Sequence, residues 1–284
     1  MNQEAFTTLL AQPRFMEACR RMIRYSVEDH FDSPIIRRAT RDMRRFMAGF
    51  FVLHLDAEGE VTLATIKALC REMGLASPGR ATALLMQLRM IGYIVPAPVQ
   101  KDRRARRYIP SPQMRACFEM FFRDTLLAAA MIEPEAQRVA ENLSDPKIWR
   151  AFISKLAKGT AGIARLNTKN PLTPFANHTA GMGVIYTIVM SGDASDTFPP
   201  SGPVRMSVAA LARQYKVSRA HVLRMLKMAE REGSLHRNSD DSTGVLCAPL
   251  RRTLLEYWAV TLMGMLACAH DALDALDSKA AEAA

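Results

Sequence analysis

A pattern of apolar, capping and stop residues occurs twice in this chain at nearly the same offset. The first copy holds Leu69-Cys70-Arg71, Ser77 and Gly92, and the second holds Leu211-Ala212-Arg213, Ser218 and Gly233. The offset is 142 residues for the tripeptides and 141 for the serines and glycines. Serine commonly caps a helix start, and glycine commonly follows a helix end. The repeat therefore predicts two pairs of helices joined by short turns, one pair in each half of the chain.

A β-hairpin is predicted directly after each helix pair, because short aromatic and β-branched segments there flank a polar tip. The expected strand, tip and strand are residues 93–95, 100–107 and 108–109 in the first half, and 235–237, 238–244 and 245–247 in the second. An apolar helix is expected after each hairpin, from Ser111-Pro112 and from Pro249. This order predicts a mostly α-helical protein of tandem winged helix-turn-helix units, with short hairpin wings and additional flanking helices.

Two prolines between Asn170 and Pro174 indicate a boundary between the halves. The expected parts are an N-terminal helical segment (1–33), a first winged helix (34–132), a helical connector (133–170) and a second winged helix with a C-terminal apolar helix (171–284).

The 284-residue chain carries a net charge of +10, which favours a polyanionic partner. Residues 1–170 contain 27 Lys and Arg against 17 Asp and Glu, whereas residues 171–284 contain 11 of each. We therefore expect the first half to dominate the electrostatic attraction to a nucleic acid.

Several other classes are disfavoured by what the sequence lacks. Five scattered cysteines without a CxxC pair indicate reduced thiols and neither disulfides nor a metal site. The N-terminus does not resemble a signal peptide, and the longest apolar stretch, 257–269, is too short to span a bilayer. No phosphate-binding loop, zinc-protease motif or nucleophile elbow is present. We expect a cytoplasmic protein without cofactor, metal or membrane contact that is not an enzyme.

The second helix pair contains Val-Ser-Arg-x-x-Val-x-Arg-x-Leu-Lys over residues 217–227. We expect Ser218 to cap its second helix, and Arg219, His221 and Arg224 to face outward. This segment resembles the helix-turn-helix of the CRP/FNR group of bacterial regulators, which implies that Arg219 and Arg224 contact DNA. The resemblance covers about thirty residues and does not extend to a cyclic-nucleotide domain. The wing of this half is acidic, so a protein partner for it stays an alternative.

The first half carries Gly92-Tyr-Ile-Val95, followed by Asp102-Arg-Arg-Ala-Arg-Arg-Tyr-Ile-Pro-Ser-Pro112. These segments resemble the wing of the MarR family of transcriptional regulators. The resemblance implies that Arg104 enters a minor groove, braced by Asp102, with Arg103, Arg106 and Arg107 nearby. It covers roughly residues 35–130, and the chain departs from the family by containing two wings and extra helices.

The helix that precedes this wing is expected to read base edges in a major groove. The residues expected to face outward from it are Ser77, Arg80, Thr82, Ala83 and Gln87. Arg80 and Gln87 are the strongest candidates for base contacts.

Together these features predict a sequence-specific DNA-binding transcriptional regulator that binds double-stranded DNA with two winged helices per chain. A plasmid-type replication initiator and a winged-helix structural protein of a chromosome-segregation complex are the alternatives. The last helix is apolar on all sides around Trp258 and Met263, which predicts burial in a homodimer or in an internal pseudo-dimer. A small-molecule effector would fit the MarR resemblance, although no residue pattern identifies one.

Overall fold

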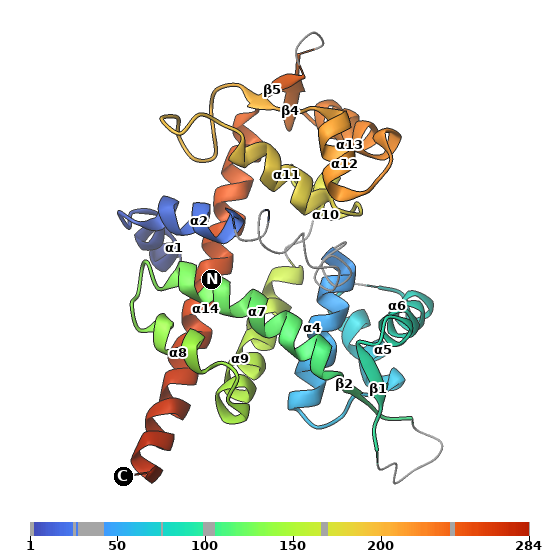
Figure 1. Ribbon diagram of the computed structural model, residues 1–284, viewed down its shortest axis with the longest axis vertical. Helices are drawn as coiled ribbons and strands as arrows, with labels where there is room; N and C mark the ends of the chain where they lie inside the picture. The colour runs from blue at the N-terminus through green and yellow to red at the C-terminus, as the bar shows by residue number, and fades with distance from the viewer. Residues whose placement is uncertain are drawn as a thin grey trace. The chain divides into compact units, whose positions relative to one another are not determined.

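The computed structural model describes residues 3–24, 27, 43–74, 76–98, 106–165, 170–238 and 242–283 (Figure 1). These residues form thirteen helices and two small antiparallel sheets, which confirms the expectation of a mostly helical protein. Internal contacts divide the chain into two compact units, each built from two separate stretches of sequence. Unit 1 contains residues 1–43 and 169–261, and unit 2 contains residues 44–168 and 262–284.

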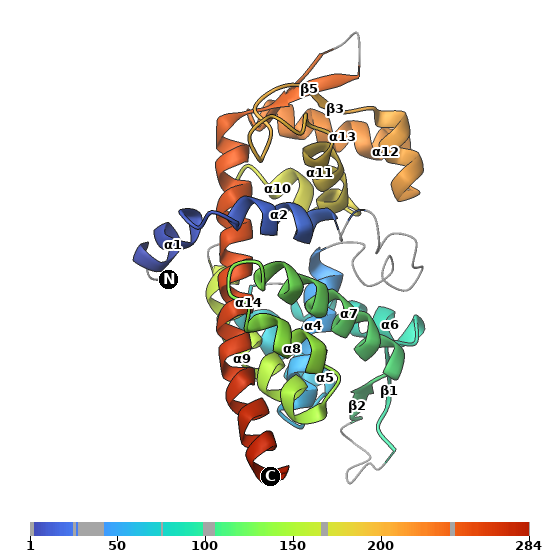
Figure 2. The same cartoon turned by 60° about the vertical axis from the view of Figure 1, so that its left-hand side comes forward.

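Unit 1 holds the second copy of the repeat. Its helices are α1 (Gln3–Leu10), α2 (Phe15–Arg24), α10 (Thr173–Ala176), α11 (Gly181–Met190), α12 (Val208–Tyr215), α13 (Arg219–Arg231) and the first part of α14 (Ala248–Ala283). Its strands are β3 (Val204–Arg205), β4 (Leu235–Arg237) and β5 (Thr243–Leu246), which form one sheet in the order β3-β5-β4 (Figure 2).

Unit 2 holds the first copy. Its helices are α4 (Met43–Ala57), α5 (Leu63–Glu72), α6 (Pro78–Met90), α7 (Pro112–Ala129), α8 (Ala136–Asn142), α9 (Pro146–Arg165) and the remainder of α14. Its strands β1 (Ile94–Pro96) and β2 (Tyr108–Pro110) pair with Val95 opposite Ile109.

This division differs from the expected boundaries in two places. The N-terminal helices group with the second copy of the repeat and do not form a separate segment. The last helix is divided between the units after Thr261, so it does not belong to the second winged helix alone. Both differences arise from contacts between residues far apart in the sequence, which local patterns do not reveal.

The two copies share a backbone hydrogen-bond pattern around the expected stop glycines. Gly92 and Gly233 both have positive φ angles, 75° and 68°, which glycine adopts without steric cost. The amide after each hairpin bonds to the carbonyl before it, from Ser111 to Tyr93 at 2.7 Å and from Cys247 to Ser234 at 3.0 Å. The sequence repeat is therefore also a structural repeat.

A third backbone segment joins each hairpin at its second strand. In unit 1, β3 pairs with β5 through Val204 opposite Gly244. In unit 2, Thr62 forms an isolated bridge with Arg107. The sequence analysis missed β3 because two residues are too few for an alternating pattern.

Each unit has its own aromatic core. In unit 1, Trp258 is fully buried and stacks on Phe198 at 5.2 Å between ring centroids, and the Arg20 guanidinium lies 4.9 Å from the Phe198 ring. In unit 2, Phe122 packs against Phe118 and Phe152. The expected burial of Trp258 is confirmed within its own chain, whereas Met263, which was expected to be buried with it, is only half-buried.

Helix α14 also meets, by length and composition alone, the requirements for crossing a membrane over Ala248–Ser278. This observation is weak evidence, because core helices of soluble proteins pass the same test. In its most apolar window 39% of the residues are buried inside the protein. The largest buried side chains of this helix are Leu250, Leu254 and Trp258 in unit 1, and Leu262, Met265 and Leu266 in unit 2.

Candidate nucleic-acid interface

Helices α12 and α13 form a closely joined pair in unit 1. The Ser218 hydroxyl accepts a hydrogen bond from the His221 amide at 3.1 Å, so Ser218 is the N-cap that the sequence predicts. Lys216 turns the chain between the helices with a positive φ of 52°, and the Val217 amide donates to the Ala212 carbonyl at 3.1 Å. The turn presents the first turns of α13 at the surface.

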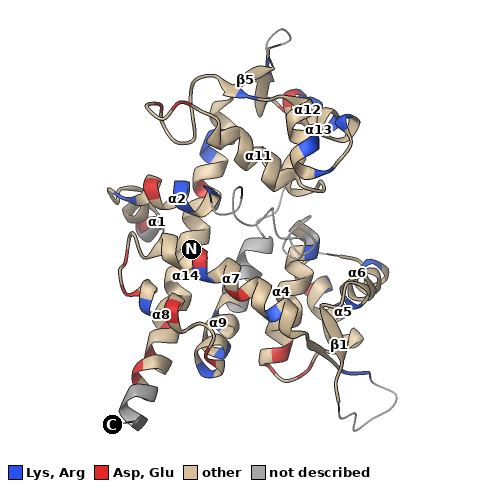
Figure 3. Cartoon of the chain, in the orientation of Figure 1, with Lys and Arg blue, Asp and Glu red and all other residues tan. Residues whose placement is uncertain are grey.

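Lys and Arg residues recur from the start to the end of α13 (Figure 3), and four of them are exposed. Arg219 and Arg224 are exposed, as expected, and Lys227 and Arg231 are exposed on the same face. Spacings of three and four residues align the last three of these side chains on a helix. None of the four forms an ion pair with another described residue, so all four charges are available to an anionic partner.

Lys227 and Arg231 were not among the residues selected from the sequence. Their signal was present, because they lie three and seven residues after Arg224. The prediction included only the two arginines that the family pattern implies. Helical periodicity alone would have extended the basic face by a further turn.

The expectation that His221 faces outward is wrong. Its half-buried ring places Nε2 3.0 Å from the Thr179 carbonyl oxygen, to which only a protonated nitrogen can donate. The ring also meets His178 edge-on, at 5.8 Å between centroids. Position 221 lies beside the inward-facing Val222 and Met225, so its side chain reaches the body of unit 1.

Helices α5 and α6 form the equivalent pair in unit 2. Ser77 precedes α6 as its N-cap, with Pro78 at the first position, although the Ser77 side chain makes no capping bond. Arg80 and Gln87 are exposed, as expected for outward residues, and base contacts by them stay a prediction. Thr82 is half-buried, and its hydroxyl donates to the Pro78 carbonyl at 3.0 Å.

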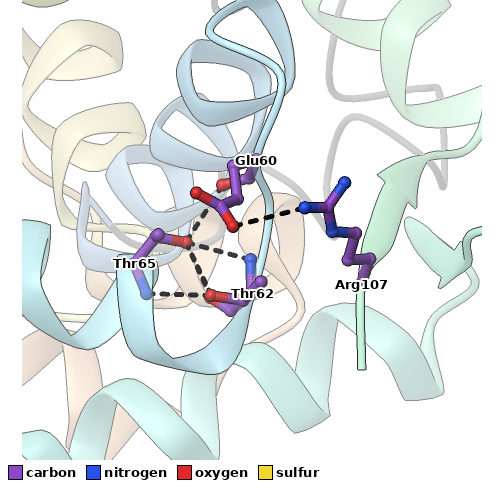
Figure 4. Close-up of polar contacts among 4 residues, drawn as sticks. All are labelled: Glu60, Thr62, Thr65 and Arg107. Atoms are coloured by element: carbon purple, nitrogen blue, oxygen red, sulfur yellow. Dashed lines mark hydrogen bonds and ion pairs between the residues drawn. The ribbon is translucent and has the colours of Figure 1, made fainter. Parts of the chain in front are cut away.

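The wing of unit 2 is described only at its base. Asp102, Arg103 and Arg104 lie outside the described residues. Arg106 is exposed, whereas Arg107 turns back to form a 3.5 Å ion pair with Glu60 (Figure 4).

Beside this pair the Thr62 hydroxyl accepts a bond from the Thr65 amide, and the Thr65 hydroxyl accepts one from the Thr62 amide. The expected cluster of wing arginines is therefore divided. Arg107 attaches the hairpin to the segment before α5, whereas Arg106 is exposed and forms no ion pair with another described residue.

The hairpin of unit 1 is joined to α13 by an ion pair. Two guanidinium nitrogens of Arg237 on β4 donate to Glu230 Oε2 on α13, at 2.8 and 2.6 Å. Burial raises the pKa of Glu230, but the hydrogen bonds and charge of Arg237 outweigh it and lower that pKa overall. The pair therefore stays ionised and holds β4 against α13.

The described residues contain no group of three His, Cys, Asp or Glu side chains placed to hold a metal ion. Four of the five cysteines are buried, and burial raises the pKa of Cys117 to about 11 and that of Cys268 to about 12. Such thiols are poor nucleophiles near neutral pH. The chain matches no protein-family model, no curated protein and no solved structure.

Proposed function

We propose that this protein is a sequence-specific DNA-binding transcriptional regulator with two winged helices per chain. The observation that carries the proposal is the unpaired basic face of α13, formed by Arg219, Arg224, Lys227 and Arg231. A helix that is capped, held by a preceding helix and basic on its outer face has the properties needed to enter a major groove.

The arrangement around each helix pair supports the same proposal. Both pairs lead into an antiparallel hairpin whose second strand is met by a segment that precedes the pair, β3 in unit 1 and Thr62 in unit 2. This order of helix, strand, helix pair and hairpin is the order that we expect of a winged helix, and so it supports the proposal. We therefore also propose that the protein acts in the cytoplasm.

The proposal predicts a salt dependence of duplex binding that α13 controls. Arg224→Gln and Lys227→Gln should each lower the slope of log K against log salt by about 1, because each loses one phosphate contact. Fluorescence anisotropy with a labelled duplex at several salt concentrations measures this slope. Arg14→Gln is the matched control, since it removes one exposed charge of unit 1 outside the helix pair. Equal slopes in all variants would contradict the proposal that α13 contacts the duplex.

A genome-wide map of binding sites tests the regulatory part of the proposal. Sites concentrated in promoters support a transcriptional regulator. Sites confined to iterated repeats at a replication origin would identify a replication initiator, which also joins two winged helices in one chain. Absence of duplex binding altogether would favour the structural alternative, in which the wings bind protein.

A further inference from the structure

The outer face of α6 is apolar, unlike that of α13. Gly79, Ala83, Met86 and Met90 are all exposed, with Met86 38% and Met90 85% accessible. Their spacings of four, three and four residues are those of the d and a positions of a heptad seam. Exposed apolar residues that form a continuous stripe mark an interaction surface more often than single exposed residues do.

Positive charges border this stripe on both sides. In the same heptad register Arg80 and Gln87 occupy e positions, and Thr82 and Arg89 occupy g positions. Arg80 and Arg89 are exposed and form no ion pair with another described residue. Residues at e and g select the charge of a partner helix, so this face fits a helix with acidic residues beside its apolar seam.

The structural repeat provides an internal comparison for α6. The positions of α13 that match the stripe at an offset of 141 are Ala220, Arg224, Lys227 and Arg231. The inward positions are apolar in both helices, where Ala81 matches Val222 and Leu85 matches Leu226, all four buried. Because the two copies share their inward packing, the apolar outer face of α6 is not required by the fold.

Two other occupants fit this face less well. A second copy of the chain would bring α6 arginines next to α6 arginines, without an acidic residue on either face to offset the repulsion. A DNA duplex requires donors and acceptors at the base edges; Arg80 and Gln87 beside the stripe supply them, but the methionines of the stripe supply no donor and only a weak acceptor. The Thr82 hydroxyl already donates to a carbonyl of its own helix.

We propose that the stripe Gly79, Ala83, Met86 and Met90 of α6 docks an acidic amphipathic helix of a partner protein. The docking mode is a helix against a helix face, with the apolar seam supplying affinity and Arg80 and Arg89 supplying charge selection. Unit 2 then recruits protein while α13 of unit 1 contacts DNA. The docking proposal does not depend on DNA binding by α13.

The test uses the full-length chain and two synthetic helical peptides. Both peptides carry leucines at a and d; one carries glutamates at e and g, and its twin carries lysines there. Calorimetry should detect binding of the glutamate peptide and at least tenfold weaker binding of the lysine peptide. Equal affinities for the two peptides, or no binding of the glutamate peptide, would overturn the proposal.

Neutral variants locate the binding site on the chain. The double variant Met86→Gln, Met90→Gln should weaken binding of the glutamate peptide at least tenfold. Met120→Gln on α7, whose side chain is 39% exposed, should leave that binding unchanged. Unchanged binding of the glutamate peptide to the double variant would contradict the proposal. Displacement of the peptide by a DNA duplex would also contradict it, because the face would then bind DNA. Arg224→Gln should leave peptide binding intact, so failure of DNA binding and failure of docking are distinguishable.

Discussion

His178 lies against the first turn of α13 in unit 1, where its ring meets the ring of His221 edge-on. Burial lowers the pKa of His178 from its ordinary value of 6.5, and the nearby charges of His221 and Arg224 lower it further. A hydrogen bond to the Pro174 backbone opposes these effects only in part. We predict that Arg224→Gln raises the pKa of His178 toward its ordinary value, because one positive charge is removed. An NMR titration of the His178 ring measures this change. An unchanged pKa would contradict the claim that the charge of Arg224 lowers the pKa of His178.

The same lowered pKa makes stability depend on pH. The folded state favours neutral His178, so its contribution is complete above the ordinary pKa of 6.5 and is lost as the pH falls below that value. We predict that the free energy of unfolding decreases from neutral pH to about pH 5. In His178→Gln this decrease should be smaller, as measured by urea denaturation at both pH values. An identical decrease in the variant would assign the pH dependence to other groups.

Trp258 is the largest fully buried side chain of the described residues, and it stacks on Phe198 in unit 1. Trp258→Ala should lower the free energy of unfolding by about 3–5 kcal/mol, because it removes a large apolar side chain and leaves a cavity. Trp258→Phe keeps an aromatic ring against Phe198 and should cost clearly less. Urea denaturation compares the two variants, and similar losses in both would contradict a packing role for the ring system.

Two of the N-caps of unit 2, Thr62 and Ser77, differ in whether the side chain makes a capping hydrogen bond. Thr62 accepts the amide of Thr65 and completes a reciprocal capping box, whereas the Ser77 side chain makes no capping bond. Thr62→Ala should therefore lower the free energy of unfolding by about 1 kcal/mol, and Ser77→Ala should lower it by less. Thermal unfolding of both variants tests this order, which equal losses would contradict.

Local signals in the sequence predicted most helices close to their observed positions. The starts of α6, α7 and α13 follow Ser77, Ser111 and Ser218, as expected, because a cap acts within one turn of the chain. Features that depend on distant residues were not predicted. Strand β3 exists through pairing with β5, and Arg107 reaches Glu60 across 47 residues of sequence.

The same limit applies to the candidate site. Helical spacing was sufficient to place Arg219 and Arg224 on an exposed face, since that face is set within α13. The inward turn of His221 depends on Thr179, which is 42 residues away in the sequence. The apolar stripe of α6 was visible as a pattern, but its exposure follows only from the tertiary structure.

The net charge is distributed differently between the two structural units than between the two halves of the sequence. The sequence halves suggested that the entire net charge lies in the first half. Unit 1, however, contains 18 Lys and Arg against 13 Asp and Glu, and unit 2 contains 20 against 15. Each unit therefore carries a net charge of +5, so charge no longer favours DNA binding by the first half. Under the proposed function, the exposed basic face of α13 makes unit 1 the better candidate for the main duplex contact.

Unit 2 is built from two separate stretches of sequence, and this predicts how a shortened piece of the chain folds. Residues 262–283 of α14 bury Leu262 and Leu266 in this unit, and Asp271 and Asp277 on the same segment form ion pairs with Lys155 and Arg138. A piece that ends at residue 170 lacks this segment and leaves its apolar neighbours exposed. We predict that residues 1–170 alone melt at a lower temperature than the whole chain, and that adding residues 171–284 restores helix content.

Circular dichroism of each piece and of their mixture measures this effect. A chain that ends at Ser278 is the control, because it keeps every α14 side chain that is described as buried in unit 2, and it should melt like the whole protein. A piece 1–170 that melts at the same temperature as the intact chain would show that α14 is not part of the folding unit of the first repeat. The prediction rests on the buried side chains, since each buried leucine contributes about 1.5–3 kcal/mol while exposed ion pairs contribute about 0–1 kcal/mol.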